Sequence, residues 1–414
     1  MSTFDVGLLV KKLPFHYGWL IVFTGTLTLF SCLGLARFAF GMLLPSMGAG
    51  LELAYDQMGY LGTGNFSGYL FAVAITPTVL NKLRPRTTIS VGLFLVATTL
   101  AGMSQANFFW QLLLLYVLTG VGSGLANIST MVLIAHWFRR EKRGLAAGLM
   151  VFGNGLGIIF SGLMVPLLNQ NYAHNGWRVS WLLLAGITFS ISLLAAFLVR
   201  NEPESLGLDP VGSKTPFSGE ELRYSGSTKS SRVLISLGLL YMAFGATYMV
   251  YGTFVVTSMV EEYGFSEVVA GRFWSWVGFF SLFSGVVFGT LSDRLGRKSG
   301  LIIVFAVQTL AYLLAGSGLG AAALLLSVFL YGIAVWAVPA IMTAAVGDYL
   351  GVTKAAAGFS FITFFFAAGQ TIGPAIAGML AEHSGSFSPA FLLSALITGV
   401  AILFALSLPQ PAES

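Results

Sequence analysis

An arginine stands inside the first long apolar stretch of the chain. Arg37 lies in the segment 18–45, about 10 residues before its end, or about 15 Å along a helix. A charge at that depth in a bilayer costs at least about 2.5 kcal/mol, so the side chain should face the protein interior. Because a guanidinium can bind a carboxylate through two parallel hydrogen bonds, we expect Arg37 to bind an anionic substrate. In the alternative, Arg37 is structural and reaches Asp56, Glu261 or backbone carbonyls.

Other polar and aromatic side chains fall inside further apolar stretches. Asn65 and Tyr69 are four residues apart and share one helix face, as do Ser123 and Asn127. Unpaired amides are unfavourable in lipid, so these groups should point inward. The candidate substrate-binding residues are Arg37, Asn65, Tyr69, Asn127, Asn154, Tyr248, Tyr251, Trp336 and Gln370. For each amide, a hydrogen bond between helices is an equally good explanation, and packing is the alternative for the aromatic residues.

Carboxylates are missing from the middle of the apolar stretches. If the chain moves a solute across a membrane, the absence of an acid that titrates inside the membrane favours uniport, anion exchange, or symport with the proton on the substrate. We expect Glu261, Glu262 and Glu267, which lie between apolar stretches, to be solvated. The histidines are scattered and no catalytic constellation occurs, so we predict no metal, no cofactor and no enzyme activity.

The composition indicates which structural elements hold these residues in place. Of 414 residues, 56% are hydrophobic and 9% are charged, whereas a soluble domain has roughly 25% charged residues. The sequence therefore predicts an all-α protein whose helices cross a lipid bilayer. The predicted spans lie near 18–45, 57–80, 88–104, 109–136, 145–168, 179–199, 234–259, 269–291, 299–316, 321–344, 356–380 and 387–408.

Basic residues cluster in alternate loops. Lys11 and Lys12 precede the first predicted span, and further Lys and Arg follow the second, fourth, sixth, eighth and tenth. This pattern predicts a multi-pass protein of the cytoplasmic membrane with both termini in the cytoplasm. Since the net charge of +5 forms no single basic face, we predict no nucleic-acid partner.

The chain also divides into two similar parts. A polar segment, 200–232, separates six predicted spans in 1–199 from six in 233–414, and we interpret it as a cytoplasmic linker. At an offset of 212 residues, Ser46-Met47 aligns with Ser258-Met259 and Asn81-Lys82 aligns with Asp293-Arg294. The repeat predicts two pseudo-symmetric six-helix bundles.

A loop motif gives this architecture a family resemblance. The segment 289–298, GTLSDRLGRK, matches G-x-L-x-D-R-x-G-R-K and so resembles the major facilitator superfamily of transporters. The first-half copy is degenerate, with Asn81 in place of the acid and Pro85 after Arg84. The resemblance implies twelve helices in two bundles, with a gating role for Gly289, Asp293, Arg294, Gly296, Arg297 and Lys298; a charged loop without a gating role is the alternative.

Shorter segments resemble particular branches of that superfamily. The segments 34–40 and 64–70 resemble a poorly characterised bacterial branch. Gly176-Trp177-Arg178 and Pro203-Glu204 show a more distant similarity to monocarboxylate and oxalate–formate porters, although the eighth span lacks the arginine of those porters.

These observations lead to one expected function and several alternatives. We expect a monomeric secondary transporter that moves a small organic anion by alternating access, with a coupled proton or an exchanged anion. Efflux of amphipathic compounds or drugs is the alternative within transport, given 14% aromatic residues. A membrane enzyme is disfavoured, and a channel or receptor would show no saturable counterflow.

Overall fold

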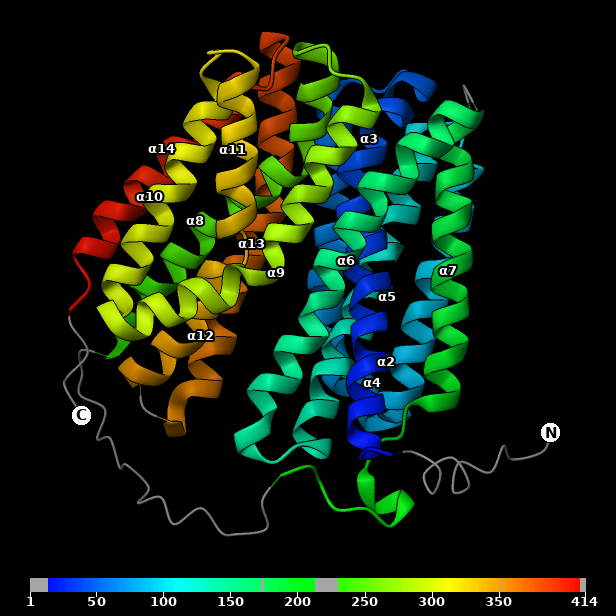
Figure 1. Cartoon of the computed structure of the whole chain (residues 1–414), viewed down its shortest axis with the longest axis vertical. Helices are drawn as coiled ribbons and strands as arrows, with labels where there is room; N and C mark the ends of the chain where they lie inside the picture. Colours follow the sequence, from blue (N-terminus) through cyan, green and yellow to red (C-terminus); the bar gives the residue numbers. More distant parts are fainter. Residues whose placement is uncertain (1–13, 173–174, 213–229, 351, 410–414) are drawn as a thin grey trace. The chain divides into compact units, whose positions relative to one another are not determined.

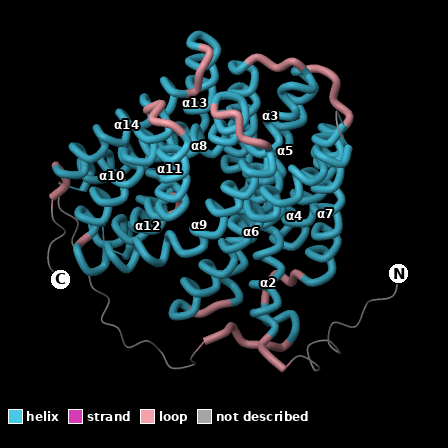
Figure 2. The backbone as a smooth tube through the Cα atoms, turned by 45° about the horizontal axis from the view of Figure 1, so that its top comes forward, coloured by secondary structure: helices cyan, strands magenta, loops and turns pink. Residues whose placement is uncertain are grey.

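The computed structural model describes residues 14–172, 175–212, 230–350 and 352–409. Within these ranges the chain is helical throughout apart from its loops (Figures 1 and 2), and its strand pairing is limited to a bridge between Phe138 and Val211. The helices of the first part are α2 (Tyr17–Leu29), η1 (Phe30–Phe38), α3 (Ala39–Leu51), α4 (Tyr55–Ser104), α5 (Phe109–Trp137), α6 (Arg140–Tyr172), α7 (Gly176–Leu198) and η3 (Pro203–Leu206). Those of the second part are α8 (Ser230–Thr257), η4 (Ser258–Glu262), α9 (Glu267–Leu295), α10 (Arg297–Gly316), α11 (Ala321–Ala334), α12 (Ala337–Leu350), α13 (Val352–Ser384) and α14 (Ser388–Leu406).

The predicted spans are confirmed as helices. In the part of the chain that the structure describes, eleven continuous helical segments are long and apolar enough to cross a membrane. One of them, α4, holds two predicted spans, because Arg84 has a positive φ of 59° and breaks the helix. Pro85 follows at once, and a residue before proline is disfavoured in the helical region. The break therefore accounts for the twelfth span.

The described chain groups into two compact units that cut across several helices. Unit 1 comprises the described residues within 1–39, 67–157 and 178–217, and unit 2 comprises those within 40–66, 158–177 and 218–414. The segment from α2 to α3 therefore changes unit between residues 39 and 40, α4 changes between 66 and 67, and α6 between 157 and 158. The predicted bundles, 1–199 and 233–414, describe the sequence repeat and remain a prediction.

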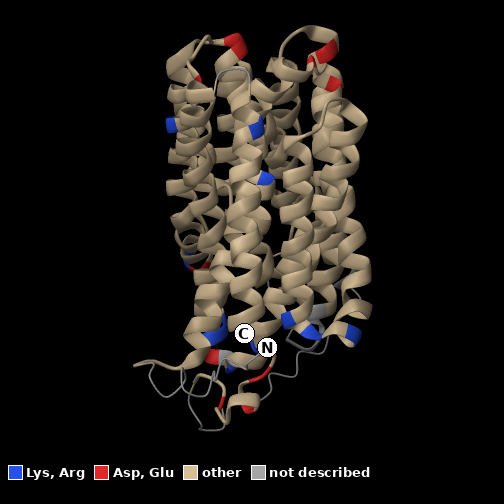
Figure 3. Cartoon of the chain, turned by 90° about the vertical axis from the view of Figure 1, so that its right-hand side faces the viewer, with Lys and Arg blue, Asp and Glu red and all other residues tan. Residues whose placement is uncertain are grey.

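Charged residues differ between the two ends of the helices. Figure 3 shows most Lys and Arg toward one end, whereas Asp and Glu lie at both ends. We call the end that carries the motif of residues 289–298 the basic end. We call the opposite end the acidic end, where helices of unit 2 begin or end near Glu52, Asp56, Glu261, Glu262, Glu267 and Glu382.

Candidate functional site

Arg37 lies in an unusual helical segment of unit 1. It belongs to η1, a nine-residue π-helix that continues α2 and leads into α3. Wide helical turns of this kind are rare and occur frequently at functional sites. The Arg37 side chain is only 6% exposed, and its guanidinium carbon lies 4.5 Å from the centroid of the Tyr69 ring. A cation at this distance from an aromatic face is stabilised by the charge distribution of the ring.

A second predicted pair completes this cluster. The amide of Asn127 on α5 donates a hydrogen bond of 2.7 Å to the hydroxyl of Tyr69 on α4. The structure therefore brings Arg37, Tyr69 and Asn127 together from three different helical segments of unit 1. We call these three residues the arginine cluster. It places a buried permanent charge beside a phenol and an amide, the groups that orient a small polar ligand.

Two further buried groups of unit 1 were not predicted. Cys32 lies five residues before Arg37 on η1, and Tyr116 lies on α5, the helix that carries Asn127. In a π-helix, positions i and i+5 lie closer to one face than they do in an α-helix. Tyr116 carried no sequence signal beyond being aromatic.

Asn154 belongs to unit 1 as well, on α6. This helix approaches η1 so closely that a methyl group added at Gly157 would lie 2.4 Å from the Cα of Gly34. Asn154 is 5% exposed, and its side-chain oxygen accepts no hydrogen bond within the described structure; the same holds for the hydroxyl of the fully buried Ser31. Buried polar atoms are normally paired, so these two are suited to receive a ligand or water.

The remaining predicted residues lie in unit 2, where an aromatic wall lines part of α8 and α13. The rings of Tyr241, Phe244, Tyr248 and Phe366 stack with centroid separations of 4.6–6.1 Å. The hydroxyl of Tyr248 donates to the side-chain oxygen of Gln370 at 3.1 Å, and the Trp336 ring lies 6.4 Å from that of Tyr248. Three predicted residues, Tyr248, Gln370 and Trp336, therefore meet at this wall.

Tyr251 makes a separate set of contacts. Tyr251 stacks on Tyr331 at 4.2 Å and shares a hydrogen bond of 2.7 Å with Ser327, so it packs α8 against α11. This environment corresponds to the packing alternative for Tyr251. Asn65 is 1% exposed within α4. Both remain predicted, not demonstrated, substrate contacts.

Glycines join first-part and second-part helices near the acidic end of unit 2. A methyl group added at Gly41 on α3 would lie 2.3 Å from the carbonyl oxygen of Gly252 on α8. A methyl group added at Gly59 on α4 would lie 2.4 Å from the Pro374 carbonyl on α13, and one added at Gly162 on α6 would lie 2.4 Å from the Gly271 carbonyl on α9. We call these the three backbone contacts. Each brings two helices together without intervening side chains, which suits surfaces that must meet and separate.

Carboxylates reinforce the same region. Glu261 accepts a 2.7 Å hydrogen bond from the hydroxyl of Tyr55, and Glu382 accepts one of 2.9 Å from the Tyr55 backbone amide. Glu267 accepts from the Asn169 amide at 2.5 Å, and Glu262 accepts from the backbone amide of Phe387 at 2.5 Å. Of the acids predicted to be solvated, Glu261 and Glu262 are exposed and Glu267 is half-buried, and all three also bind specific donors.

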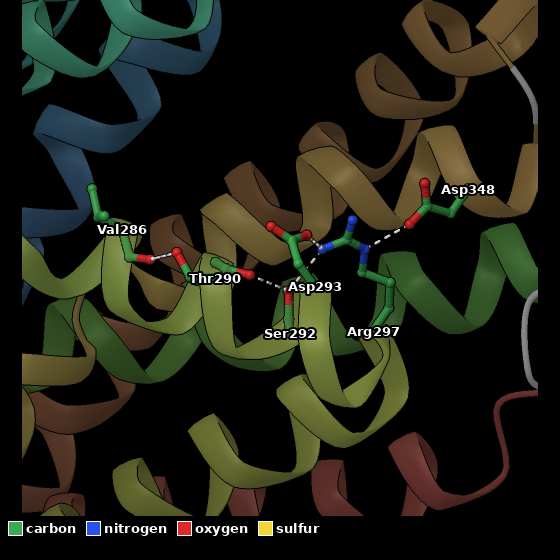
Figure 4. A network of polar contacts seen from close by, with 7 residues as sticks. Val286, Thr290, Ser292, Asp293, Arg297 and Asp348 are labelled. Atoms are coloured by element: carbon green, nitrogen blue, oxygen red, sulfur yellow. Dashed lines mark hydrogen bonds and ion pairs between the residues drawn. The ribbon is translucent and has the colours of Figure 1, made fainter.

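The loop motif forms a charge network at the basic end (Figure 4). Arg297 donates to Asp293, to the Ser292 hydroxyl at 2.8 Å and, through Nε, to Asp348 at 2.6 Å. Lys298 donates to the carbonyl of Leu408 at 3.1 Å, and Gly296 turns the chain between α9 and α10 with a φ of 87°. Asp348 was not among the predicted residues, because α12 runs to Leu350 and extends the span expected to end at 344.

We expect Arg297→Gln to destabilise the protein more than Asp348→Asn, because it leaves Asp293 and Asp348 near each other without the shared cation. The contacts are partly exposed and screened, so Asp348→Asn should lower the melting temperature by only about 1–3 °C. Thermal unfolding of the purified protein checks this, with Glu204→Gln as the control for removing a carboxylate elsewhere. An equal effect of Arg297→Gln and Glu204→Gln would contradict the network.

Both the fold and the sequence of this chain match known proteins. The solved structure of the nucleoside transporter NupG superimposes with a TM-score of 0.72 at 15% identity, covering 95% of this chain and 99% of that chain. At this identity the likeness shows a shared fold. Residues 29–406 match the model of the family described as "Uncharacterised MFS-type transporter YbfB". The chain belongs to this family.

Curated relatives cover most of the chain at low identity. The hexuronate transporter of Bacillus subtilis is 24% identical over 400 residues, covering 91% of this chain and 91% of its own. Monocarboxylate transporter 12 of Rattus norvegicus is 26% identical over 356 residues, covering 79% and 71%. The predictions of a twelve-helix major facilitator fold, and of a membrane transporter instead of an enzyme, are confirmed.

Proposed function

We propose that this protein is a secondary transporter that moves a small organic carboxylate across the cell membrane by alternating access. The observation that carries the anion assignment is the arginine cluster: a guanidinium buried over Tyr69, with Asn127 held beside it. A carboxylate can take two parallel hydrogen bonds from Arg37, which a neutral solute cannot match. The names of the two curated relatives, a hexuronate and a monocarboxylate transporter, support the same substrate class.

The three backbone contacts support the mechanism. They join α3, α4 and α6 to α8, α13 and α9 near the acidic end, where Glu261, Glu267 and Glu382 add hydrogen bonds. In this proposal these contacts form the closed gate on one side of the membrane and separate when the transporter opens to that side. The Arg297 network stabilises the opposite ends of the second-part helices.

The orientation is part of the same proposal. Basic residues gather at the end of the helices opposite to the acidic end (Figure 3). By the positive-inside rule the basic end lies in the cytoplasm, which makes the acidic end external. The closed gate of this structure is then the external one.

Counterflow in proteoliposomes tests the substrate class. Vesicles loaded with a hexuronate or a short monocarboxylate should accumulate the same labelled compound from outside, saturably and without ohmic current, whereas vesicles loaded with the corresponding neutral sugar should not. Binding should also raise the melting temperature of the purified protein, since a ligand stabilises the state that binds it. Equal counterflow of neutral sugars would remove the anion assignment.

The aromatic wall favours one second candidate, efflux of amphipathic compounds. Stacked rings such as Tyr241, Phe244 and Phe366 offer apolar area with little polar specificity. A deletion strain that becomes sensitive to amphipathic drugs, while carboxylate uptake is unchanged, would favour efflux.

A further inference from the structure

A groove on the membrane-facing side of unit 2 lies outside the site described above. Two adjoining hollows, of about 290 and 400 Å³, share Ser275 and Trp276 and run between α6 and α9. Their apolar lining is Ile159, Leu163, Val269, Phe273, Trp276, Phe279 and Phe280. Trp276 and Phe279 are 55% and 52% exposed, as expected of side chains that face lipid.

The close crossing of the two helices explains the groove. Gly162 and Gly271 meet backbone to backbone, and the hydroxyl of Ser275 donates to the Ile159 carbonyl at 3.2 Å. Because the crossing is filled by glycines, the large side chains stand on its flank and leave a channel between them. The hydrogen bond between Asn169 and Glu267 fixes the crossing at its acidic end.

One cation, Arg272, lines this apolar channel. It is exposed, and it lies five residues after the start of α9 at Glu267, about 7.5 Å along the helix. A 29-residue helix is about 43 Å long and exceeds a hydrocarbon core of about 30 Å by about 6 Å at each end. Arg272 therefore lies where the hydrocarbon meets the headgroups, with the channel running about 10 Å deeper to Phe279.

We propose that this groove binds one anionic phospholipid, with the phosphate on Arg272 and an acyl chain between α6 and α9. The charge and the lining together select this occupant: a guanidinium binds phosphate strongly, and apolar walls exclude a free polar anion. Bound at the α6–α9 crossing, the lipid contacts both helices of one backbone contact.

Native mass spectrometry of the full chain, incubated with equimolar palmitoyl-oleoyl phosphatidylglycerol and phosphatidylcholine, tests this proposal. The wild type should retain one phosphatidylglycerol with about five-fold preference or more, as expected for a charge contact of about 1 kcal/mol. Arg272→Gln should lose the preference, Arg272→Lys should keep part of it, and Val269→Phe, which fills the groove, should reduce retention of both lipids.

The matched control is Arg178→Gln, which removes the same charge from an arginine whose guanidinium binds the carbonyls of Ser104 and Ala106. It should leave the preference unchanged. The proposal is overturned if Arg272→Gln keeps the wild-type preference for phosphatidylglycerol, or if Arg178→Gln loses as much of that preference as Arg272→Gln. It is also overturned if Val269→Phe retains as much lipid as the wild type. Each of these results would mean that the lipid surrounds the protein without a specific site.

Discussion

Arg37→Ala should abolish uptake of the carboxylate substrate while the protein still inserts and remains monodisperse. Removing a bidentate, charge-assisted pair of hydrogen bonds from a buried site costs about 3 kcal/mol, or about 100-fold in affinity. Arg37→Lys keeps the charge but offers no planar pair of donors, so it should lose most of the activity. Initial rates of uptake in proteoliposomes, normalised to the amount of protein, measure both effects.

The controls for this experiment come from the same cluster. Tyr69→Phe keeps the ring under the guanidinium but removes the hydroxyl that accepts from Asn127, so it should weaken transport less than Arg37→Ala. The substrate-induced rise in melting temperature should disappear in Arg37→Ala and persist in Tyr69→Phe. Uptake by Arg37→Ala at the wild-type rate would show that Arg37 is a structural tie and that the anion binds elsewhere.

Gly41→Leu should reduce transport to background by preventing closure at the acidic end. The new side chain would enter the backbone of α8, where the Gly252 carbonyl leaves no room for even a methyl group. Overpacking costs about 1–3 kcal/mol. Only the closed arrangement carries this cost, so the equilibrium between the two arrangements shifts about 5- to 150-fold toward the open one. The variant should still fold, because the open arrangement separates these helices.

A matched substitution and a labelling measurement distinguish prevented closure in Gly41→Leu from misfolding. Gly186→Leu adds the same side chain on α7, where a new Cβ would meet nothing within 4 Å, and should leave transport unchanged. Thr63→Cys on a Cys32→Ser background places the only thiol beside the Thr371 carbonyl, which accepts a hydrogen bond from Thr63 at 2.7 Å. An impermeant maleimide should label it several-fold faster in Gly41→Leu. Unchanged labelling together with normal transport would show that the helices need not close at Gly41.

The helices were predictable because lipid imposes a strong and simple pattern. Every backbone group must be paired inside the hydrocarbon, so each apolar run of about 20 residues becomes a helix. The spans from 109–136 to 387–408 match observed helices to within a few residues at most ends, with α12 the longest extension. Pro85, noted only as a departure from the loop motif, marks the break at Arg84.

The arginine cluster was predictable only in part. Helical spacing placed Asn65 with Tyr69, but not Tyr69 against Arg37, because contacts between helices depend on crossing points that a single sequence does not encode. The π-helix η1 was not predicted either, because its wider turns leave no mark in the apolar pattern. The division into units was also unexpected: α3 and the start of α4 group with the second-part helices, through backbone contacts that glycines alone do not reveal.

Three helical segments change unit close in sequence to predicted site residues. The changes fall two residues after Arg37, between Asn65 and Tyr69, and three residues after Asn154. In the transport mechanism that we propose, bending of these helices would move Arg37, Asn65 and Asn154 with them. A solute bound to those side chains would then resist the bending directly, without a relay through the rest of the fold.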